Sequence, residues 1–157
     1  MQTATLEATA RKLLEAVGAE IESLDLVGSE RPTLKAQVRD SHLVIGPNGE
    51  HLRAINHVLK RLLEKETGEE PHVAYLLDAN GFFEKKNEAV RANARMLGER
   101  ARLFKHDVEM SPVSAYERML IHELFANDPQ IKTESQGEGK FRHVVLKYVE
   151  SSEKKVS

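Results

Sequence analysis

Two side chains with complementary chemistry, Arg118 and His122, lie four residues apart in a segment that the sequence predicts to be helical. At this spacing two side chains project from the same side of a helix, about 40° apart. A guanidinium binds a phosphate through a planar fork of donors, and an imidazole one turn away can donate a further hydrogen bond. The pair therefore fits a phosphate-binding site, although the same two residues would also serve as a structural hydrogen-bonding pair.

A second candidate anion site is the loop Gly46-Pro47-Asn48-Gly49, which precedes a long predicted helix. Glycines allow a close backbone approach, and the free N–H groups and positive dipole end of the helix attract anions. The helix also has a basic side that includes Arg53 and Lys60, which suits a strand of phosphates running from the loop along the helix. A tight turn followed by a solvated charged face explains the same pattern.

The sequence contains no recognisable pattern for catalysis or metal binding. The absence of cysteine excludes disulfides, thiol catalysis and cysteine-ligated zinc or iron–sulfur sites. His122-Glu123 matches the start of a zinc-protease helix, but Ala126 occupies the position of the second histidine. No Gly-Lys-Ser/Thr follows the glycine loop, and no Gly-x-Gly-x-x-Gly is present, which excludes the common nucleotide-binding loops. We therefore expect a protein that is not an enzyme, with no cofactor and no metal.

Apolar periodicity predicts the elements that position these residues. For the first half it predicts a helix ended by Gly18, strands over 21–26 and 34–38, a short apolar piece over 42–45, a helix from the glycine loop to about Thr67, and a buried strand over 72–78. For the second half it predicts a basic helix over 84–105, a short strand over 107–110, a helix capped by Ser114 and Glu117 that runs to about 126, and strands near 131–135 and 141–148. The polar tail, residues 151–157, is expected to be disordered.

Charge is distributed unevenly along the 157 residues. The 25 acidic and 23 basic side chains give a net charge of −2, which taken alone argues against nucleic-acid binding. Residues 1–40 carry 5 basic and 7 acidic side chains, whereas residues 83–106 carry 7 basic and 3 acidic ones. Aromatic residues make up only 5%, and tryptophan is absent, so a wide base-stacking platform is not expected.

No apolar run reaches the roughly 18 residues of a membrane span, and the N-terminus lacks the pattern of a signal peptide. These features predict a cytoplasmic chain with no membrane insertion.

Residues 1–80 resemble a KH domain of the type II topology. The order of elements fits that topology, and Val44 to Gly49, followed by Leu52 and Ile55, matches the signature of the family. The resemblance implies a helix packed on a three-stranded sheet, with RNA lying across the loop and an adjacent apolar groove. The two middle loop positions, often basic in this family, are Pro47 and Asn48 here.

Residues 88–148 resemble the single-stranded nucleic-acid-binding domain named for its Arg-three-His motif. Arg118-x-x-x-His122 is followed by Thr133-x-Ser135-x-Gly137-x-Gly139 and by Arg142 before an apolar strand. The resemblance implies that the Arg and His contact single-stranded nucleic acid from an exposed helix face, with neighbouring strand residues reaching phosphate or sugar.

A KH domain directly followed by an Arg-three-His domain resembles the arrangement in the Jag (SpoIIIJ-associated) family of bacteria. The resemblance implies an α+β chain, with a KH-like domain over 1–80 joined by a helix to a small α/β Arg-three-His domain over 81–150. The implied function is binding of single-stranded RNA, or single-stranded DNA, by a post-transcriptional regulator linked to cell elongation and envelope control. The implied nucleic-acid contacts are Gly46, Pro47, Asn48, Gly49, Arg53, Lys60, Arg118, His122, Thr133, Ser135, Gly137 and Arg142.

The acidic first third and the missing loop cation also fit a different role. In this alternative the KH surface binds a protein, and the chain is an adaptor or inhibitor of a larger cytoplasmic assembly. The sequence does not predict the oligomeric state.

Overall fold

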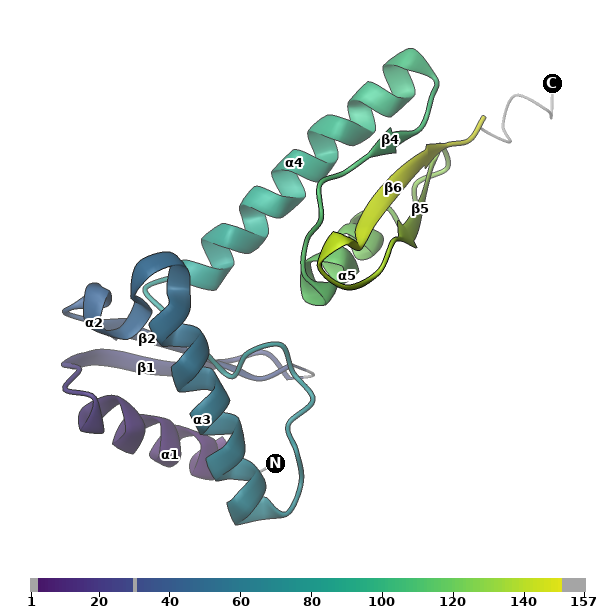
Figure 1. Ribbon diagram of the computed structural model, residues 1–157. Helices are drawn as coiled ribbons and strands as arrows, with labels where there is room; N and C mark the ends of the chain where they lie inside the picture. The colour runs from purple at the N-terminus through teal and green to yellow at the C-terminus, as the bar shows by residue number, and fades with distance from the viewer. Residues whose placement is uncertain (1–2, 30, 151–157) are drawn as a thin grey trace. The chain divides into compact units, whose positions relative to one another are not determined.

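The computed structural model describes residues 3–29 and 31–150. The chain divides into two compact units, Met1–Glu84 and Lys85–Ser157, and each combines helices with a three-stranded sheet (Figure 1). This mixture of helices and small sheets agrees with the predicted fold class. The predicted disordered tail, 151–157, lies outside the described residues. In the part of the chain that is described, no helix has the length and apolar character needed to cross a membrane.

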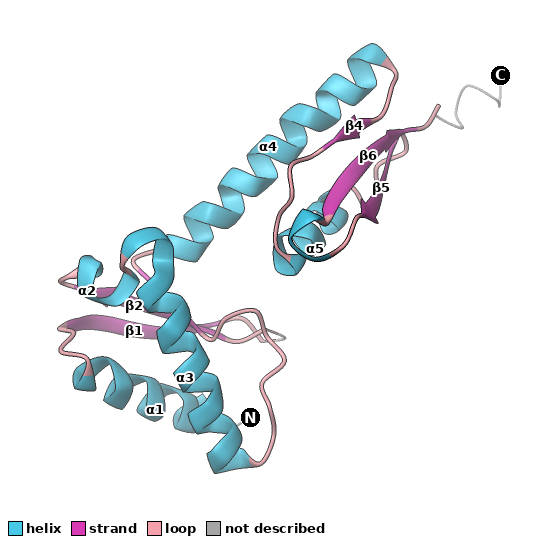
Figure 2. Ribbon diagram, viewed as in Figure 1, coloured by secondary structure: helices cyan, strands magenta, loops and turns pink. Residues whose placement is uncertain are grey.

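The first unit follows the predicted order of elements. They are α1 (Thr3–Ala16), β1 (Ile21–Val27), β2 (Thr33–Val38), α2 (Ser41–Ile45), the 3-10 turn η1 (Pro47–Gly49), α3 (Glu50–Thr67) and β3 (Leu77–Ala79). Strand β2 is central, antiparallel to β1 and parallel to β3 (Figure 2). The helix ends agree with the glycine signals, since Gly68 adopts a left-handed conformation and its N–H bonds to the carbonyl of Glu64 at 2.8 Å.

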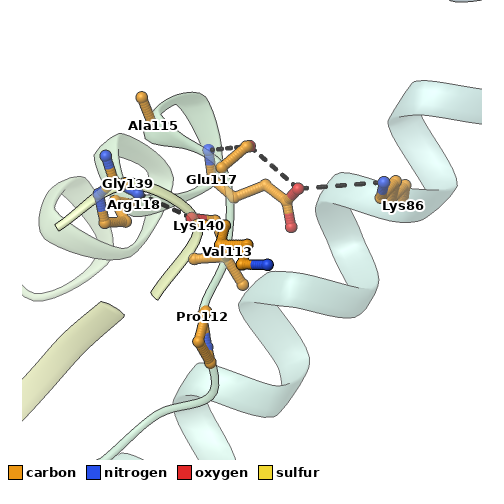
Figure 3. Close-up of a pocket in the computed structure, with 9 residues that line it drawn as sticks. Lys86, Pro112, Val113, Ala115, Glu117, Arg118, Gly139 and Lys140 are labelled. Carbon is orange, nitrogen blue, oxygen red and sulfur yellow. Dashed lines mark hydrogen bonds and ion pairs between the residues drawn. The ribbon is translucent and has the colours of Figure 1, made fainter. Parts of the chain in front are cut away.

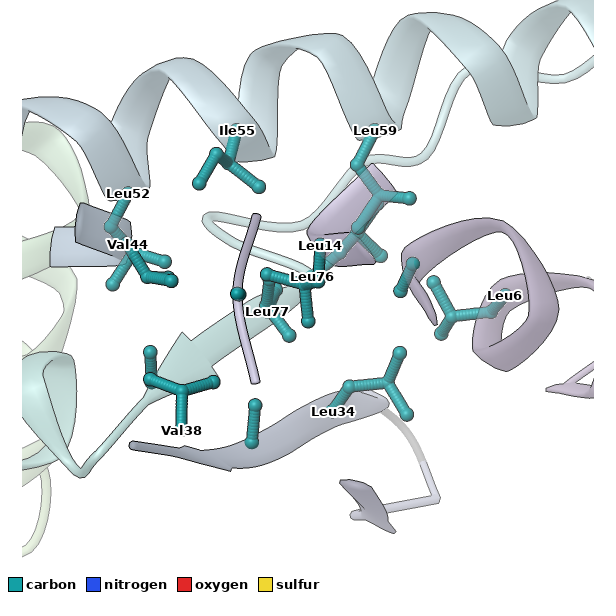
Figure 4. Packing of buried hydrophobic residues seen from close by; sticks show 14 of the residues in the cluster. Leu6, Leu14, Leu34, Val38, Val44, Leu52, Ile55, Leu59, Leu76 and Leu77 are labelled. Carbon is teal, nitrogen blue, oxygen red and sulfur yellow. The ribbon is translucent and has the colours of Figure 1, made fainter. Parts of the chain in front are cut away.

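A cluster of buried leucines holds α1 and α3 against this sheet. Figure 4 shows Leu6 and Leu14 of α1, Leu52 and Leu59 of α3, and Leu34 of β2 meeting in one core. Each of these five side chains is fully buried, and full burial of a leucine contributes about 1.5–3 kcal/mol. The cluster therefore fixes the start of α3, and with it the glycine loop that precedes the helix.

The third strand is shorter than the sequence predicts, covering only Leu77–Ala79 instead of 72–78. The carbonyls of Val73 and Ala74 accept hydrogen bonds from the ammonium group of Lys60, at 2.6 and 3.1 Å. This stretch is bonded to α3 and does not pair with β2, so an apolar run that resembles a strand forms an ordered loop instead.

Asn56 of α3 covers the outer edge of β3. Its Oδ1 accepts hydrogen bonds from the N–H groups of Leu76 and Leu77, at 2.8 and 2.9 Å, and its Nδ2 donates to the carbonyl of Leu77 at 2.9 Å. Asn56 is buried, and its hydrogen bonds satisfy backbone groups that an edge strand would otherwise leave unpaired.

The second unit contains most of α4 (Phe82–Phe104), followed by β4 (Val108–Glu109), α5 (Ala115–Leu124), β5 (Ile131–Gln136), the 3-10 turn η2 (Gly139–Phe141) and β6 (His143–Tyr148). Its sheet is antiparallel, with β6 between β4 and β5. Ile121 of α5, Ile131 of β5 and Leu146 of β6 are fully buried in its core. The packing holds α5 against β5, the two elements that carry Arg118, His122, Thr133 and Ser135, while Gly137 and Arg142 lie between β5 and β6.

Candidate functional site

The N-terminus of α5 is fixed by Ser114, as the sequence predicts. The Ser114 hydroxyl oxygen accepts a hydrogen bond from the Glu117 N–H at 3.2 Å and donates to the Glu117 carboxylate at 3.0 Å. One face of the helix buries Leu120 and Ile121 in the core. The cap and this buried face together set the direction in which Arg118 and His122 project.

His122 lies between two hydroxyl groups of β5. Its Nδ1 is 2.6 Å from the Thr133 Oγ1, and its Nε2 is 2.8 Å from the Ser135 Oγ. Thr133 and Ser135 are two residues apart on one strand, so their side chains point to the same face of the sheet. The structure thus brings together three residues that the sequence analysis singled out from separate segments.

Two arginines lie beside this group, each anchored by one backbone carbonyl. Arg118 donates to the carbonyl of Val113 at 2.7 Å, and Arg142 donates to the carbonyl of Gly137 at 2.8 Å. A guanidinium has five N–H donors, so one anchoring bond orients the group without exhausting its donors. Gly137 therefore acts through its carbonyl, by positioning Arg142.

The surroundings keep the imidazole neutral. Partial burial lowers the pKa of His122 below its ordinary value of 6.5, and the positive charges of Arg118 and Arg142 lower it further. In a neutral imidazole one ring nitrogen donates and the other accepts, and a hydroxyl group can partner either one. The cluster therefore offers an anion two cations and, near them, neutral hydrogen-bonding groups.

A hollow of about 590 Å³ opens beside Arg118 (Figure 3). Lys86 of α4 and Lys140 of the loop before β6 line it together with Arg118. Glu117 also lines it and lies 4.0 Å from the Lys86 ammonium group. Lysine and arginine outnumber acids around the hollow, so it extends the positive surroundings of Arg118.

The glycine loop of the first unit is closely packed. Gly46 has a φ of 70°, and a Cβ built on it would lie 2.4 Å from the ring of His51. Gly49 has a φ of 77°, and a Cβ there would lie 2.4 Å from the ring of Phe82. Both positions therefore require glycine for conformation and for space.

The backbone N–H groups of this loop are less available than expected. The N–H of Gly46 donates to the carbonyl of His42 at 3.0 Å, and that of Gly49 donates to the carbonyl of Gly46 at 3.2 Å. Pro47 has no N–H group. The N–H groups of the two glycines are therefore bonded within the loop, and an anion contact at Gly46 and Gly49 stays a prediction.

Arg53 brings a positive charge to the loop, and Lys60 does not. The Arg53 guanidinium, from the first turns of α3, donates to the carbonyl of Asn48. Lys60 turns its ammonium group toward the loop before β3, and burial there lowers its pKa, an effect that Glu70 opposes. Lys60 thus stabilises the chain near Val73, in contrast to the phosphate contact that the sequence predicted.

The sequence analysis did not single out three residues of the second unit as candidate binding residues. Lys86 and Lys140 line the hollow beside Arg118, and Phe141 is exposed in the loop between β5 and β6. The glycines at 137 and 139 indicated a loop, which was a signal that Lys140 would be exposed. Phe141 was instead predicted as the first residue of the strand near 141–148, which in the structure begins at His143. Over residues 3–29 and 31–150, no group of three or more histidine or acidic side chains is placed to hold a metal ion.

Comparison with known proteins identifies the second half of the chain. Residues 88–148 match the family model of the Arg-three-His domain, and this segment includes the whole cluster around His122. Residues 88–148 form an Arg-three-His domain. Arg118 and His122 lie within this segment at the Arg-x-x-x-His spacing, and so do Thr133 and Ser135, whose hydroxyl groups contact the His122 ring.

Two curated relatives extend the similarity beyond the Arg-three-His domain. The chain is 27% identical over 107 residues to the RNA-binding protein KhpB of Clostridium symbiosum, an alignment covering 68% of this chain and 47% of the relative. It is 30% identical over 108 residues to the RNA-binding protein KhpB of Bacillus subtilis (strain 168), covering 68% and 51%. The chain therefore spans about half the length of the curated relatives it matches.

Proposed function

We propose that this protein binds single-stranded RNA, with its main phosphate contacts at Arg118 and Arg142. The observation that carries the proposal is the cluster in which two anchored guanidinium groups flank an imidazole bonded to Thr133 and Ser135. The Arg-three-His match over 88–148 and the names of the two relatives support the same function.

The chemistry of the cluster favours the sugar–phosphate backbone over base edges. The two arginines can each bind phosphate oxygens through a fork of donors. His122, Thr133 and Ser135 can hydrogen-bond to a phosphate or to a ribose hydroxyl. Contacts of this kind position a strand without reading its sequence. We therefore expect RNA binding that weakens with salt and has little sequence preference. Single-stranded DNA should also bind if none of these contacts depends on the ribose 2′-hydroxyl, which DNA lacks.

In the same proposal residues 1–80 form a type II KH domain that supplies a second contact with RNA. The order of elements from α1 to β3 and the mixed sheet with β2 at its centre support this assignment. Arg53, held at the glycine loop, takes the place of a cation within the loop. The role in post-transcriptional regulation of cell elongation and envelope control depends on this RNA binding and belongs to the same proposal.

The proposal is tested by measuring the affinity of the full chain for a fluorescent single-stranded RNA of about ten nucleotides, by anisotropy at low salt. Arg118→Ala and Arg142→Ala are each expected to weaken binding by about tenfold, because each removes a charge-assisted contact with phosphate. Lys132→Ala is the matched control. The side chains of Lys132 and Thr133 are neighbours on β5 and point to opposite faces of the sheet, so this substitution removes one positive charge from the face away from the cluster. Absence of binding, or equal losses in all three variants, would contradict the proposal.

A protein-binding role for the first unit is the second candidate function. The N–H groups of Gly46 and Gly49 are bonded within the loop, and the apolar side chains of Val17 and Leu43 are exposed. Arg53→Ala separates the two candidates. A loss of RNA affinity in this variant supports a nucleic-acid contact at the glycine loop. Unchanged affinity, in a chain whose RNA binding is still weakened by Arg118→Ala, favours a protein-binding surface in the first unit.

A further inference from the structure

Phe141 is an exposed aromatic residue next to the cluster around His122. It lies in η2, in the loop between β5 and β6, and is 66% exposed. A phenylalanine side chain gains stability by burial, so an exposed ring on an ordered loop has no evident role in the core of this domain. The position of the ring in the loop indicates a role in binding.

The loop holds Phe141 by hydrogen bonds on both sides. The Phe141 N–H donates to the carbonyl of Glu138 at 3.1 Å, and the Arg142 N–H donates to the carbonyl of Gly139 at 3.2 Å. The Arg142 guanidinium also returns to the carbonyl of Gly137 at 2.8 Å. These bonds fix the backbone beneath the ring, so the entropy lost when a ligand stacks on it is small.

One cation lies over the ring, and a second follows it in the sequence. Lys140 places its ammonium nitrogen 5.3 Å from the centre of the Phe141 ring, and Lys140 lines the hollow beside Arg118. On the other side of Phe141 in the sequence, Arg142 lies close enough to lower the pKa of His122. A partner that fits this surface presents a flat apolar face between negative groups, which is the chemistry of a base between two phosphates.

We propose that Phe141 stacks on one unpaired base of the bound strand, while Lys140 and Arg142 hold the phosphates on either side. This inference rests on the proposed function and adds a base contact to it. A stacked ring accepts any base, since every base has a π-face, so the contact raises affinity without adding sequence preference. A single ring also agrees with the low aromatic content, which excludes only a wide stacking platform.

The test compares Phe141→Leu with the unchanged full chain, using a mixed-sequence single-stranded RNA of about ten nucleotides and an oligomer of equal length that lacks bases. Leucine keeps an apolar side chain but removes the aromatic ring. We expect Phe141→Leu to bind the RNA about tenfold more weakly and to bind the base-free oligomer as the unchanged chain does. Phe104→Leu is the matched control, because Phe104 is 61% exposed and lies 18 residues beyond Lys86 on α4, about 27 Å along the helix.

A second variant gives a direct signal of stacking. The chain contains no tryptophan, so Phe141→Trp introduces a single tryptophan at the proposed contact, whose emission can be excited apart from that of the three tyrosines. We expect the RNA to quench its emission and the base-free oligomer to leave it unchanged. Equal RNA affinity of Phe141→Leu and the unchanged chain would overturn the stacking proposal alone and leave the loop as a protein contact. Absence of RNA binding by the unchanged chain would overturn the proposed function and the stacking proposal together.

Discussion

At the scale of single residues, His122 combines a fixed position with a pKa that a ligand can change. Its ring is bonded to Thr133 and Ser135, and burial with two nearby arginines keeps it neutral near neutral pH. A phosphate placed between Arg118 and Arg142 would offset part of the positive charge that the two arginines place near the imidazole. Because a negative neighbour favours the charged imidazolium, a bound phosphate would raise the pKa of His122.

The pKa of His122 is thus lowered in the free protein and raised in the complex, and this difference predicts that RNA affinity increases as the pH falls below neutral. The imidazole takes up a proton more readily in the complex than in the free protein, so binding strengthens between the bound-state pKa and the lower free-state pKa. The free-state pKa lies below 6.5, so the increase in affinity continues below that pH until the free protein is also protonated. A difference of one pKa unit between the two states would strengthen binding about tenfold. Anisotropy titrations between about pH 5 and pH 8 at constant ionic strength measure this effect.

The controls for this pH dependence use glutamine at two histidines. His122→Gln keeps a hydrogen-bonding side chain that does not titrate, and its affinity should be flat with pH. His143 is the rival titrating group, because its bonds to the Phe141 carbonyl and to Glu109 raise its pKa. His143→Gln should retain the pH dependence, since His143 is not bonded to Thr133 or Ser135. The lowered pKa of His122 also predicts that the domain loses stability as the pH falls through that pKa, so thermal unfolding must be followed in parallel. A pH dependence that persists in His122→Gln would contradict the assignment.

At the scale of elements, α3 is bounded by two glycines with nearly the same backbone conformation. Gly49 precedes the helix with φ 77° and ψ 14°, and Gly68 follows it with φ 78° and ψ 1°. A Cβ at Gly49 would lie 2.4 Å from the Phe82 ring, whereas a Cβ at Gly68 would meet nothing within 4 Å. The two positions therefore share the cost of a left-handed conformation and differ in packing.

This difference predicts unequal effects of alanine at the two ends of α3. Gly68→Ala should lower the free energy of unfolding by about 1 kcal/mol, the cost of placing a side chain in the left-handed region. Gly49→Ala should lower it by a further 1–3 kcal/mol or so, because the new methyl group must displace the Phe82 ring. Urea unfolding of the two variants gives both values. Equal losses at the two positions would mean that the glycine loop is not packed tightly against Phe82.

The elements were largely predictable from local signals, whereas the direction of long side chains was not. Gly18, Gly68 and Ser114 mark helix ends in the sequence because their effects are local. Lys60 has the same helical spacing as a surface cation, and only the fold decides that its ammonium group bonds to the chain before β3. The exposure of Phe141 was hidden for a related reason, since an aromatic residue beside a strand is normally counted as core.

At the scale of the whole molecule, the net charge of −2 is reflected in how the basic side chains are paired. Arg91 and Arg95 of the basic helix α4 both form ion pairs with Glu88, at 3.8 and 3.1 Å. Arg102 is paired with Glu99 and Asp128. Arg91, Arg95 and Arg102, three of the seven basic side chains over residues 83–106, are thus held in ion pairs within the fold, which makes them less available to phosphate than the sequence suggests.

Limited free charge predicts a shallow salt dependence of RNA binding. Each phosphate contact with a single strand contributes about −0.7 to the slope of log K against log salt concentration. Contacts from Arg118, Arg142 and Lys140, together with Arg53 at the glycine loop, should therefore give a slope of about −3, and Arg118→Ala should reduce its magnitude by about 0.7. Titrations from about 50 to 500 mM salt measure the slope, and Lys132→Ala should leave it unchanged because Lys132 lies on the opposite face of β5. A slope steeper than about −5 would require many more cations at the interface than the cluster around His122 provides, and a slope near zero would mean that phosphate is not the group these arginines bind.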